Sequence, residues 1–371
     1  MNKSLDLKAG EWIEVRSKDE ILKTLDKNGQ FEGLPFMPQM FNYCGKRFRV
    51  FKRAHKTCDT VYPVRGRRLE SAVHLETRCD GQAYGGCQAG CLIFWKEAWL
   101  KRVGGAESAP APALPTEAAT RTEQDVWSGT RAPGQANVPD PIYVCQATRL
   151  PEFTQSLHWW DIRQYIEDYS SGNTGLWRII RGFIYAAYYN VSQSGLKLGR
   201  PMRWLYDRFQ TVRGGSPFPR RQGLIPRGER TPAGALNLQP GELVRVKSYK
   251  EILATLDKDN KNRGLYFDAE AVPFCGGTYR VLSRVSRILD EKTGKLIKLK
   301  NESIILEGVY CQARYSDCRL FCPRSIYSYW REIWLERVEE SDMTKGQGRL
   351  GETAKIIEHA PAENLVASSK Q

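Results

Sequence analysis

The feature that most limits how this chain can fold is an internal duplication. Residues 10–27 read GEWIEVRSKDEILKTLDK and residues 241–258 read GELVRVKSYKEILATLDK, with eleven of eighteen positions identical at an offset of 231. Three pairs of cysteines align at the same offset and a fourth pair aligns after one residue of slippage: Cys44 with Cys275, Cys87 with Cys318, Cys91 with Cys322, and Cys79 with Cys311. Self-similarity at a fixed spacing indicates one structural unit present twice.

Within each copy the pattern predicts a small, mostly antiparallel β-barrel. The first residues of each copy alternate between apolar and polar, which is typical of a half-buried strand. Ser17 and Ser248 each precede a glutamate by three residues, the spacing of a capping box, so we expect a short helix after each. Aromatic and β-branched residues after Cys44 and Cys275 predict further strands. The sum is an α+β fold that resembles an SH3-like barrel in outline, a likeness that carries no function.

The segments outside the copies differ in composition. Residues 104–140 are rich in Ala, Pro, Thr and Glu without apolar periodicity, which indicates a flexible linker. Residues 141–213 have no counterpart and are helical in character, with Trp159, Ile162, Ile166 and Tyr169 expected on one helix face. The predicted layout is repeat 1 at 1–103, a linker at 104–140, a basic aromatic helical segment at 141–213, a second linker at 214–237, repeat 2 at 238–338 and a disordered tail at 339–371.

The cysteine spacing in each copy suggests a metal site. C-x7-C-x3-C in copy 1 and C-x6-C-x3-C in copy 2 each precede a Trp-Leu-x-Arg-Val ending. Zinc favours tetrahedral thiolate sites, and four protein ligands leave no open position, so we expect one structural zinc ion per copy. Iron–sulfur clusters, disulfides and buried reduced cysteines are the alternatives. The predicted ligands are Cys44, Cys79, Cys87 and Cys91 in copy 1 and Cys275, Cys311, Cys318 and Cys322 in copy 2, whereas Cys58 and Cys145 are interpreted as incidental thiols.

Positive charge is concentrated between the two copies. The chain carries a net charge of +14, and residues 169–228 contain ten Lys or Arg and a single acid, Asp207, interleaved with aromatic residues. Basic helices with Trp and Tyr can lie at an anionic membrane interface. The same mixture can bind phosphates and stack bases, and it can also be the solvated face of a structural subdomain. The residues predicted to contact an anionic surface are Trp177, Arg178, Arg181, Lys197, Arg200, Arg203, Trp204, Arg208 and Arg213.

Catalytic motifs are scarce. The chain contains no P-loop, no G-x-S-x-G and no H-E-x-x-H. His158 and Asp161, three residues apart, are the one candidate acid–base pair. The N-terminal residues lack an apolar core, and no run of about 18 apolar residues occurs. We therefore expect a non-enzymatic cytoplasmic protein, with the periphery of the inner membrane as one location.

Two runs carry a family resemblance. YVCQATRLPEFTQSLHWWDIRQYIEDYSSGN and LPFMPQMFNYCGKRFRVFKRAHKTCDT resemble an uncharacterised bacterial family associated with gene clusters for exopolysaccharide assembly. The resemblance covers residues 10–213 and, through the duplication, 241–338; it implies no catalytic residues. It implies an accessory protein near a membrane-bound glycan machinery. The resulting hypothesis is a zinc-binding tandem scaffold or adaptor at an anionic surface, with a nucleic-acid-binding protein as the alternative and an enzyme using His158 and Asp161 as the third.

Overall fold

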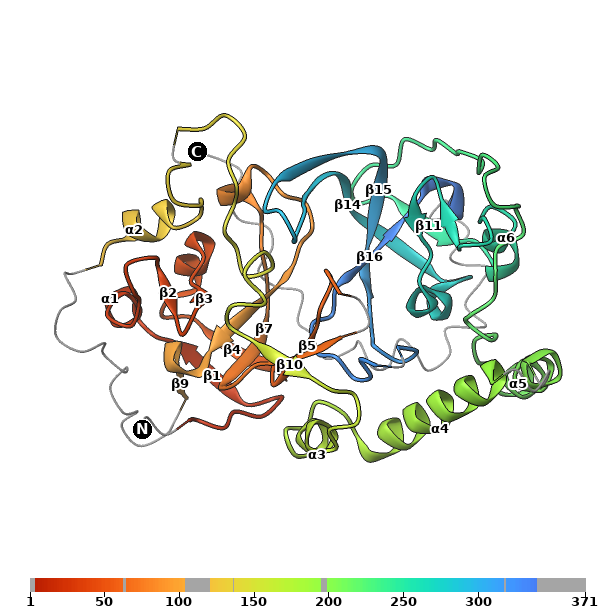
Figure 1. Cartoon of the computed structure of the whole chain (residues 1–371), viewed down its shortest axis with the longest axis horizontal. Helices are drawn as coiled ribbons and strands as arrows, with labels where there is room; N and C mark the ends of the chain where they lie inside the picture. The colour runs from red at the N-terminus through yellow and green to blue at the C-terminus, as the bar shows by residue number, and fades with distance from the viewer. Residues whose placement is uncertain are drawn as a thin grey trace.

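The fold is known from a computed structural model that describes residues 4–62, 65–103, 121–135, 137–194, 199–316 and 318–338. Two five-stranded sheets, each curled into a half-barrel, lie beside one another, and helices flank one of them (Figure 1). The predicted α+β class is confirmed, while the likeness to an SH3-like barrel stays a prediction. The predicted tail and the first part of the first linker, residues 104–120, lie outside the described residues.

Copy 1 forms an antiparallel sheet in the strand order β8-β7-β4-β1-β9. Two short strands form a separate hairpin, and three 3-10 helices connect the main strands. The elements are β1 (Trp12–Val15), α1 (Lys18–Leu22), β2 (Gln30–Phe31), β3 (Leu34–Pro35), η1 (Pro38–Tyr43), β4 (Arg47–Arg53), β5 (Lys56–Cys58), β6 (Gly66–Arg68), β7 (Ala72–Arg78), η2 (Gln82–Tyr84), β8 (Leu92–Lys96), η3 (Glu97–Trp99) and β9 (Leu100–Arg102).

Copy 2 repeats this sheet strand for strand, in the order β16-β15-β14-β11-β17. The duplication seen in the sequence is therefore also a duplication of topology. The elements are β11 (Leu243–Val246), α6 (Tyr249–Leu253), β12 (Lys261–Asn262), β13 (Leu265–Tyr266), η4 (Ala269–Phe274), β14 (Thr278–Leu289), β15 (Leu296–Tyr310), β16 (Tyr327–Trp330), η5 (Glu332–Trp334) and β17 (Leu335–Arg337).

Both copies use the same devices to build their cores. Each short helix begins with the predicted capping box, Ser17 with Glu20 and Ser248 with Glu251. The indole Nε1 of Trp99 donates to Thr24 Oγ1 at 3.1 Å, and Trp334 donates to Thr255 at 2.9 Å. A buried indole needs such a partner, because an unpaired buried donor costs free energy.

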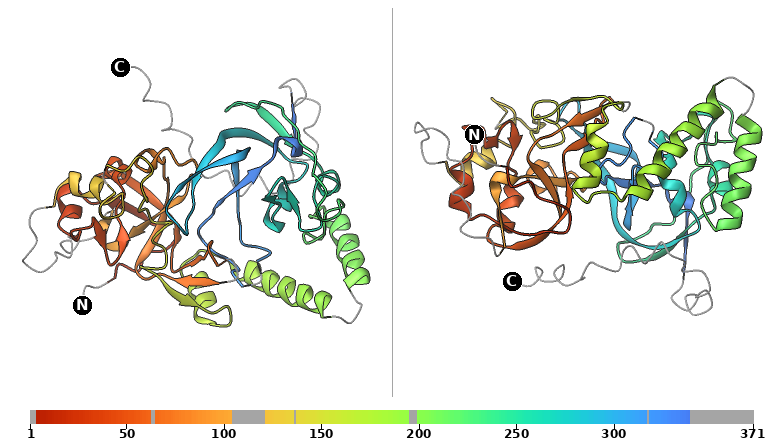
Figure 2. Two further views of the ribbon diagram at one scale, coloured as in Figure 1. Left: turned by 45° about the horizontal axis from the view of Figure 1, so that its top comes forward. Right: turned by 90° about the horizontal axis from the view of Figure 1, so that it is seen from below.

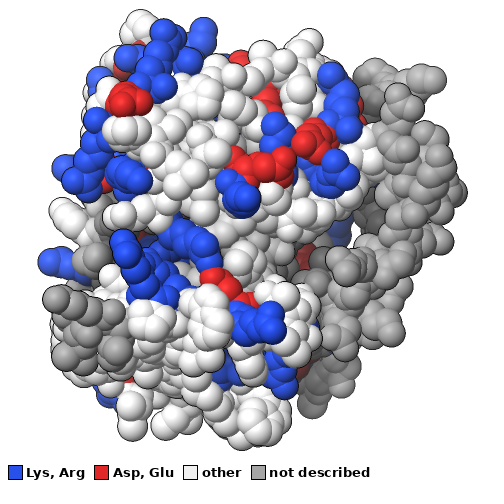
Figure 3. Space-filling view, turned by 90° about the vertical axis from the view of Figure 1, so that its right-hand side faces the viewer, with Lys and Arg blue, Asp and Glu red and all other residues white. Residues whose placement is uncertain are grey.

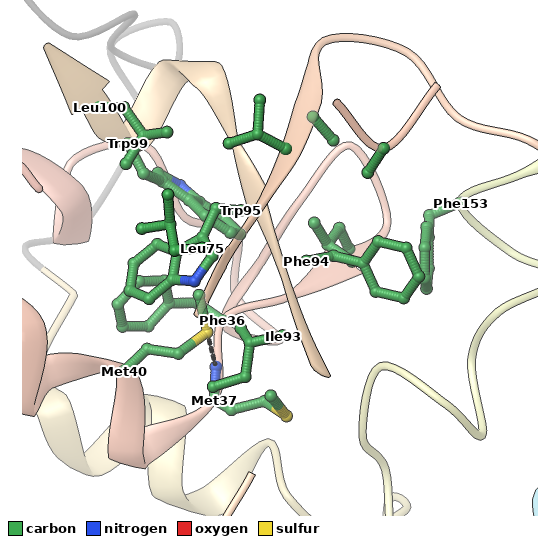
Figure 4. Close-up of a cluster of buried hydrophobic side chains, with 14 of the residues drawn as sticks. Phe36, Met37, Met40, Leu75, Ile93, Phe94, Trp95, Trp99, Leu100 and Phe153 are labelled. Carbon is green, nitrogen blue, oxygen red and sulfur yellow. Dashed lines mark hydrogen bonds between the residues drawn. The ribbon is translucent and has the colours of Figure 1, made fainter. Parts of the chain in front are cut away.

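Aromatic side chains fill each half-barrel. Phe36 meets the edge of Trp99 with ring centroids 5.1 Å apart, and the equivalent rings in copy 2, Phe267 and Trp334, lie 5.2 Å apart. Figure 4 shows Trp99 close to Leu75 and Phe36 in copy 1, with Phe94 against Phe153 on the other side of the strands. Phe153 comes from beyond the first linker, so copy 1 takes part of its core from the middle segment.

The copies differ in the hairpins that follow β4 and β14, and these hairpins reach across to the other copy. Copy 1 has the short hairpin β5–β6, whereas β14 and β15 form one long hairpin (Figure 1). The backbone N–H of Cys58 donates to Cys322 Sγ at 3.2 Å, and that of Leu289 donates to Cys87 Sγ at 3.3 Å. Cys58 and Leu289 are equivalent positions, so each copy donates a backbone hydrogen bond from the same position to a cysteine of the other copy, although the accepting cysteines are not equivalent.

A buried arginine joins the two hairpins. The Arg324 side chain is 3% exposed and pairs with Glu291 at 3.1 Å. Its Nη1 donates to the Cys58 carbonyl at 3.2 Å and to Thr60 Oγ1 at 3.3 Å. Thr60 also hydrogen-bonds Glu291, its own equivalent at the 231 offset. One guanidinium therefore joins both hairpins where the two copies meet.

The middle of the chain packs on both copies. Helix α2 (Glu123–Ser128) lies within the predicted first linker, and β10 (Gln155–Leu157) pairs with β6 of copy 1. Helices α3 (Arg163–Ser170), α4 (Leu176–Gln193) and α5 (Gly199–Arg213) follow; α4 and α5 lie beside copy 2 (Figure 2). The predicted second linker runs along copy 2, where the N–H groups of Leu224 and Ile225 donate to the carbonyls of Leu253 and Leu256, both at 3.0 Å.

The buried His74 is expected to make the stability of the fold depend on pH. Burial lowers the pKa of His74 to about 3, from 6.5, and Nδ1 of its fully buried ring donates to the Ile93 carbonyl at 2.9 Å. Between these two pH values the unfolded chain binds a proton that the folded chain does not, so stability falls as the pH drops. We expect the free energy of unfolding to lose roughly 2 kcal/mol between pH 7 and pH 5 through this one group.

The matched variant is His74→Ile, because the equivalent position in copy 2 is the buried Ile305. Denaturant unfolding at pH 7 and pH 5 should show a smaller loss in this variant than in the natural chain. An equal loss in both proteins would show that His74 does not carry this pH dependence.

Arg324→Met tests the contact between the hairpins. The change leaves the Glu291 carboxylate and the Cys58 carbonyl without their buried partner, and breaking a buried pair costs about 3–5 kcal/mol. Arg227→Met is the control, since it breaks an exposed pair with Asp259 worth at most about 1 kcal/mol. Chemical unfolding of both variants measures the difference, and equal small effects would contradict the role given to Arg324.

Candidate functional sites

Three cysteines of copy 1 come together around a cavity. Cys79, Cys87 and Cys91 line a space of about 40 Å³, and the Cys79 N–H donates to the Cys91 carbonyl at 2.9 Å. The fourth thiol on this cavity is that of Cys145, from the segment after α2. Leu289, Glu291 and Arg324 of copy 2 complete the wall, so the cavity lies where the two copies meet.

The predicted fourth ligands lie elsewhere. Cys44 and Cys275 each end a 3-10 helix, η1 and η4, and each packs against the core cluster of its own copy. Burial raises the pKa of Cys44 to about 11 and that of Cys275 to about 12. Neither residue is part of the cavity lining or of the cysteine cluster of copy 2. The structure therefore places these two thiols against the cores of their own copies and does not bring them to the other cysteines, while their role as zinc ligands stays a prediction.

The cysteines of copy 2 gather around a thiol of copy 1. Cys58 and Cys322 are both buried and pack with Ala313, and Cys311 packs against the same cluster. Cys58 and Cys322 share a side-chain hydrogen bond, which lowers the pKa of Cys322 to about 7. A Cβ on Gly66, the strand partner of Cys58, would lie 3.9 Å from the Cys318 carbonyl oxygen. Cys58, interpreted from sequence as incidental, therefore takes part in this cluster.

None of the ten cysteines, all within the described residues, is joined in a disulfide. Over the same residues, no three or more His, Cys, Asp or Glu side chains are already arranged to hold a metal ion. The zinc assignment thus stays a prediction. Sequence reasoning missed Cys58 and Cys145 because one aligns with Leu289 and the other has no counterpart. The number of cysteines could have suggested them, because the two cysteines outside the predicted quartets are enough to add one thiol to each close-spaced set of three.

Helix α3 presents its apolar side to solvent. Its buried residues are Gln164, Tyr165 and Asp168. The Asp168 carboxylate lies 2.5 Å from Lys56 Nζ and 3.3 Å from His55 Nε2 in copy 1. The apolar residues expected on one helix face, and the neighbouring Trp160, are exposed: Trp159, Trp160, Ile162, Ile166 and Tyr169. The helix expected to carry these residues begins only at Arg163, after β10 at residues 155–157.

Lys56 lies where copy 1, α3 and copy 2 meet. Its Nζ also donates to the Leu320 carbonyl at 2.9 Å and lies 4.8 Å from the centre of the Tyr165 ring. Burial lowers the pKa of Lys56, while the charge of Asp168 opposes this change. Since a buried ammonium and carboxylate require each other, they fix which face of α3 turns inward.

Helix α4 has one packed face and one exposed apolar face. Ile179, Gly182 and Tyr185 are buried, and Tyr165 and Phe183 make an edge contact at 4.8 Å that joins α3 to α4. Trp177 is 75% exposed and Trp204, on α5, is 67% exposed. The exposed apolar residues of the two helices are Leu176, Trp177, Ile180, Phe183, Ile184 and Val191 on α4 and Trp204, Leu205, Phe209 and Val212 on α5. With those of α3 they are called the helical apolar surface below.

The predicted cationic residues fall into two groups. Arg178 donates to the Gln312 carbonyl at 2.7 Å and so anchors α4 to copy 2. Arg213 lies over the Phe209 ring at 5.0 Å, and Lys197 lies outside the described residues. Within the described part of the chain, the remaining four have no acidic partner: Arg181, Arg200, Arg203 and Arg208.

The surrounding charge is mixed. Figure 3 shows the side of the molecule on which α5 and α6 lie, where Lys and Arg side chains stand in separate groups with Asp and Glu between some of them. Asp207, the single acid among residues 169–228, is paired with Arg221. Cationic charge on this face is therefore divided into patches.

His158 and Asp161 are not brought together as an acid–base pair. The His158 ring stacks on Trp160 with centroids 4.3 Å apart. Asp161 instead binds Arg163 through both carboxylate oxygens, at 2.9 and 2.7 Å, and these hydrogen bonds lower the pKa of Asp161 to about 2. The Asp161 carboxylate thus binds Arg163, the first residue of α3, and not His158.

Searches against family models, curated proteins and solved structures returned no match. The likeness to a bacterial exopolysaccharide-associated family therefore remains an expectation from the quoted runs alone. Of the helices that the structure describes, none combines the length and the apolar composition needed to cross a bilayer.

Gly182→Ala tests how α4 is held on copy 2. A Cβ at Gly182 would lie 2.4 Å from Cζ of Phe321, closer than carbon atoms can approach. Alanine normally favours a helix over glycine by about 1 kcal/mol, but overpacking costs about 1–3 kcal/mol, so we expect net destabilisation and faster hydrogen exchange over α4.

The control is Gly175→Ala, at the start of the same helix, where an added Cβ meets nothing within 4 Å. Stabilisation of α4 by alanine at Gly182 would contradict the close contact with Phe321.

Proposed function

We propose that this protein is a non-enzymatic scaffold that docks peripherally on an anionic membrane through its helical apolar surface. The observation that carries the proposal is the orientation of α3, which buries Gln164 and Asp168 together with Tyr165 and exposes the apolar Ile166 and Tyr169. A contiguous exposed apolar surface marks an interaction site, because leaving it in water costs free energy.

The chemistry of the surface favours lipid. Aliphatic side chains such as Ile162, Ile166 and Ile184 alternate with the exposed indoles of Trp177 and Trp204. Aliphatic groups gain from entering the acyl boundary, and indoles prefer the headgroup level. Nucleic acid would offer stacking to the aromatic rings but nothing to the aliphatic side chains.

Charge supports an anionic partner. Arg181 follows Trp177 by one helical turn, and Arg200, Arg203 and Arg208 lie on α5 with the exposed Trp204. Each Lys or Arg near an anionic surface contributes about 1 kcal/mol to binding. Their guanidinium groups can reach headgroup phosphates while the apolar side chains enter the interface.

The biological setting follows from the family resemblance. A peripheral adaptor with a membrane-facing helical surface suits an accessory role beside a membrane-linked polysaccharide machinery. On this proposal the β-sheets would carry the protein partner.

A competition experiment tests the proposal. The full chain is offered vesicles containing anionic lipid, vesicles of zwitterionic lipid, and single- and double-stranded nucleic acid at near-physiological salt. We expect binding to anionic vesicles, with a blue shift of tryptophan emission. Salt should weaken this binding without abolishing it, because salt screens the attraction between charges but not the burial of apolar side chains. Preferential binding to nucleic acid would overturn the proposal, and so would indifference to anionic vesicles.

Matched variants separate the two contributions. Arg181→Glu with Arg208→Glu should lower vesicle affinity at least about tenfold, since about 2 kcal/mol of attraction is lost. Trp177→Ser with Trp204→Ser should abolish the blue shift. The controls are Arg230→Glu and Trp127→Ser, exposed residues of the same types away from α4 and α5. Equal effects of variants and controls would argue against this surface.

A further inference from the structure

The turns that carry the cysteines have positive φ angles at the same two positions in both copies, but in copy 2 these positions are not glycine. In copy 1, Gly81 and Gly90 have φ values of 70° and 58°; the matching positions in copy 2 are Ala313 and Phe321, with φ of 49° and 63°. Positive φ costs a non-glycine residue of order 1–3 kcal/mol and persists only where the surroundings enforce it. Two such residues within the Cys311–Cys322 turn indicate that the positions of the thiols are held at a cost.

Hydrogen-bond donors are directed at the sulfur atoms. Gln39 Nε2 donates to Cys79 Sγ at 3.2 Å, the Leu289 N–H donates to Cys87 Sγ, and the Cys58 N–H donates to Cys322 Sγ. Hydrogen bonds to sulfur stabilise a thiolate and are the usual outer shell of thiolate metal sites. A neutral thiol is a weak acceptor and does not require them.

Arginine side chains, one buried and one half-buried, lie beside the two clusters. Arg324 lines the cavity of copy 1 and donates to the carbonyl of Cys58 in the other cluster. Arg78 donates to the Gly90 carbonyl at 2.8 Å, next to Cys91. Four thiolates around a divalent ion carry a net charge of about −2, and buried charge must be compensated. The cations therefore fit the charge that two such ions would create.

We propose that the chain binds two zinc-class divalent ions, one by Cys79, Cys87, Cys91 and Cys145, and one by Cys58, Cys311, Cys318 and Cys322. This inference is independent of the proposed membrane docking and changes the ligand sets expected from sequence alone. Each set joins the three cysteines of one copy to a fourth thiol from outside that copy. The second ion would bridge the two copies, because Cys58 belongs to β5 of copy 1.

Binding follows a simple balance. Each ion displaces four thiol protons and forms four metal–sulfur bonds, without oxidation or reduction. In the described arrangement the thiols of copy 1 surround a cavity of about 40 Å³ and do not converge on one point. An ion would draw the sulfur atoms toward it, and the four sulfur ligands leave no position for water, so the sites are structural.

Metal content of variants tests the ligand sets. The purified full chain should contain about two zinc ions, and Cys145→Ser and Cys58→Ser should each lose one. Cys44→Ser and Cys275→Ser are the controls and should keep both, since these residues lie in their own cores. Loss of metal from either control, or two ions retained in Cys58→Ser, would overturn the assignment. Iron with acid-labile sulfide would overturn the choice of zinc.

A second measurement uses the natural chain, so that the ligand sets can be tested even where a cysteine variant fails to fold. Alkylation of thiols, mapped by mass spectrometry with and without a chelator, should accelerate at the eight proposed ligands and stay unchanged at Cys44 and Cys275. Hydrogen exchange should also rise on chelation in β5 and in residues 311–325 together, because they share one ion. Rates of alkylation and hydrogen exchange that are the same with and without the chelator would refute the proposal, and so would a disulfide between Cys58 and Cys322.

Discussion

A single buried guanidinium is the contact on which the arrangement of the two copies depends. Arg324 binds the carboxylate of Glu291 from one hairpin and the backbone of Cys58 from the other, with almost no access to solvent. A charge so placed is stable only when every partner is present. The hairpins must therefore cross between the copies, and each cysteine cluster is closed by a strand that is not its own.

The buried ion pair of Lys56 and Asp168 explains why the apolar residues of α3 are exposed. Lys56 and Asp168 lie at the junction of copy 1, α3 and copy 2, and their mutual requirement turns the polar face of α3 inward. The apolar face then has nowhere to pack within the described residues. A helix that ordinarily would bury Ile162, Ile166 and Tyr169 exposes them instead, and α4 also has an exposed apolar face.

The proposed metal sites and the docking surface meet at one side chain. Phe321, held at positive φ beside Cys322, fills the space above Gly182 of α4 and packs with Tyr165 of α3. An ion bound by Cys58 and Cys322 would stiffen the base on which both helices rest. Rigid support of this kind favours docking, because fewer side chains and segments must be ordered on contact.

The sequence by itself determined the elements that depend on local order. The duplication, the capping boxes at Ser17 and Ser248 and the strands around them follow from residues a few positions apart, and they recur in both copies. The grouping of Cys79, Cys87 and Cys91 was also predictable, since one turn carries all three. The tertiary structure alone decided the fourth thiols and the inverted face of α3. Both depend on hairpins and buried charges from opposite copies, and alignment of one copy on the other hides such contacts because they join positions that are not equivalent.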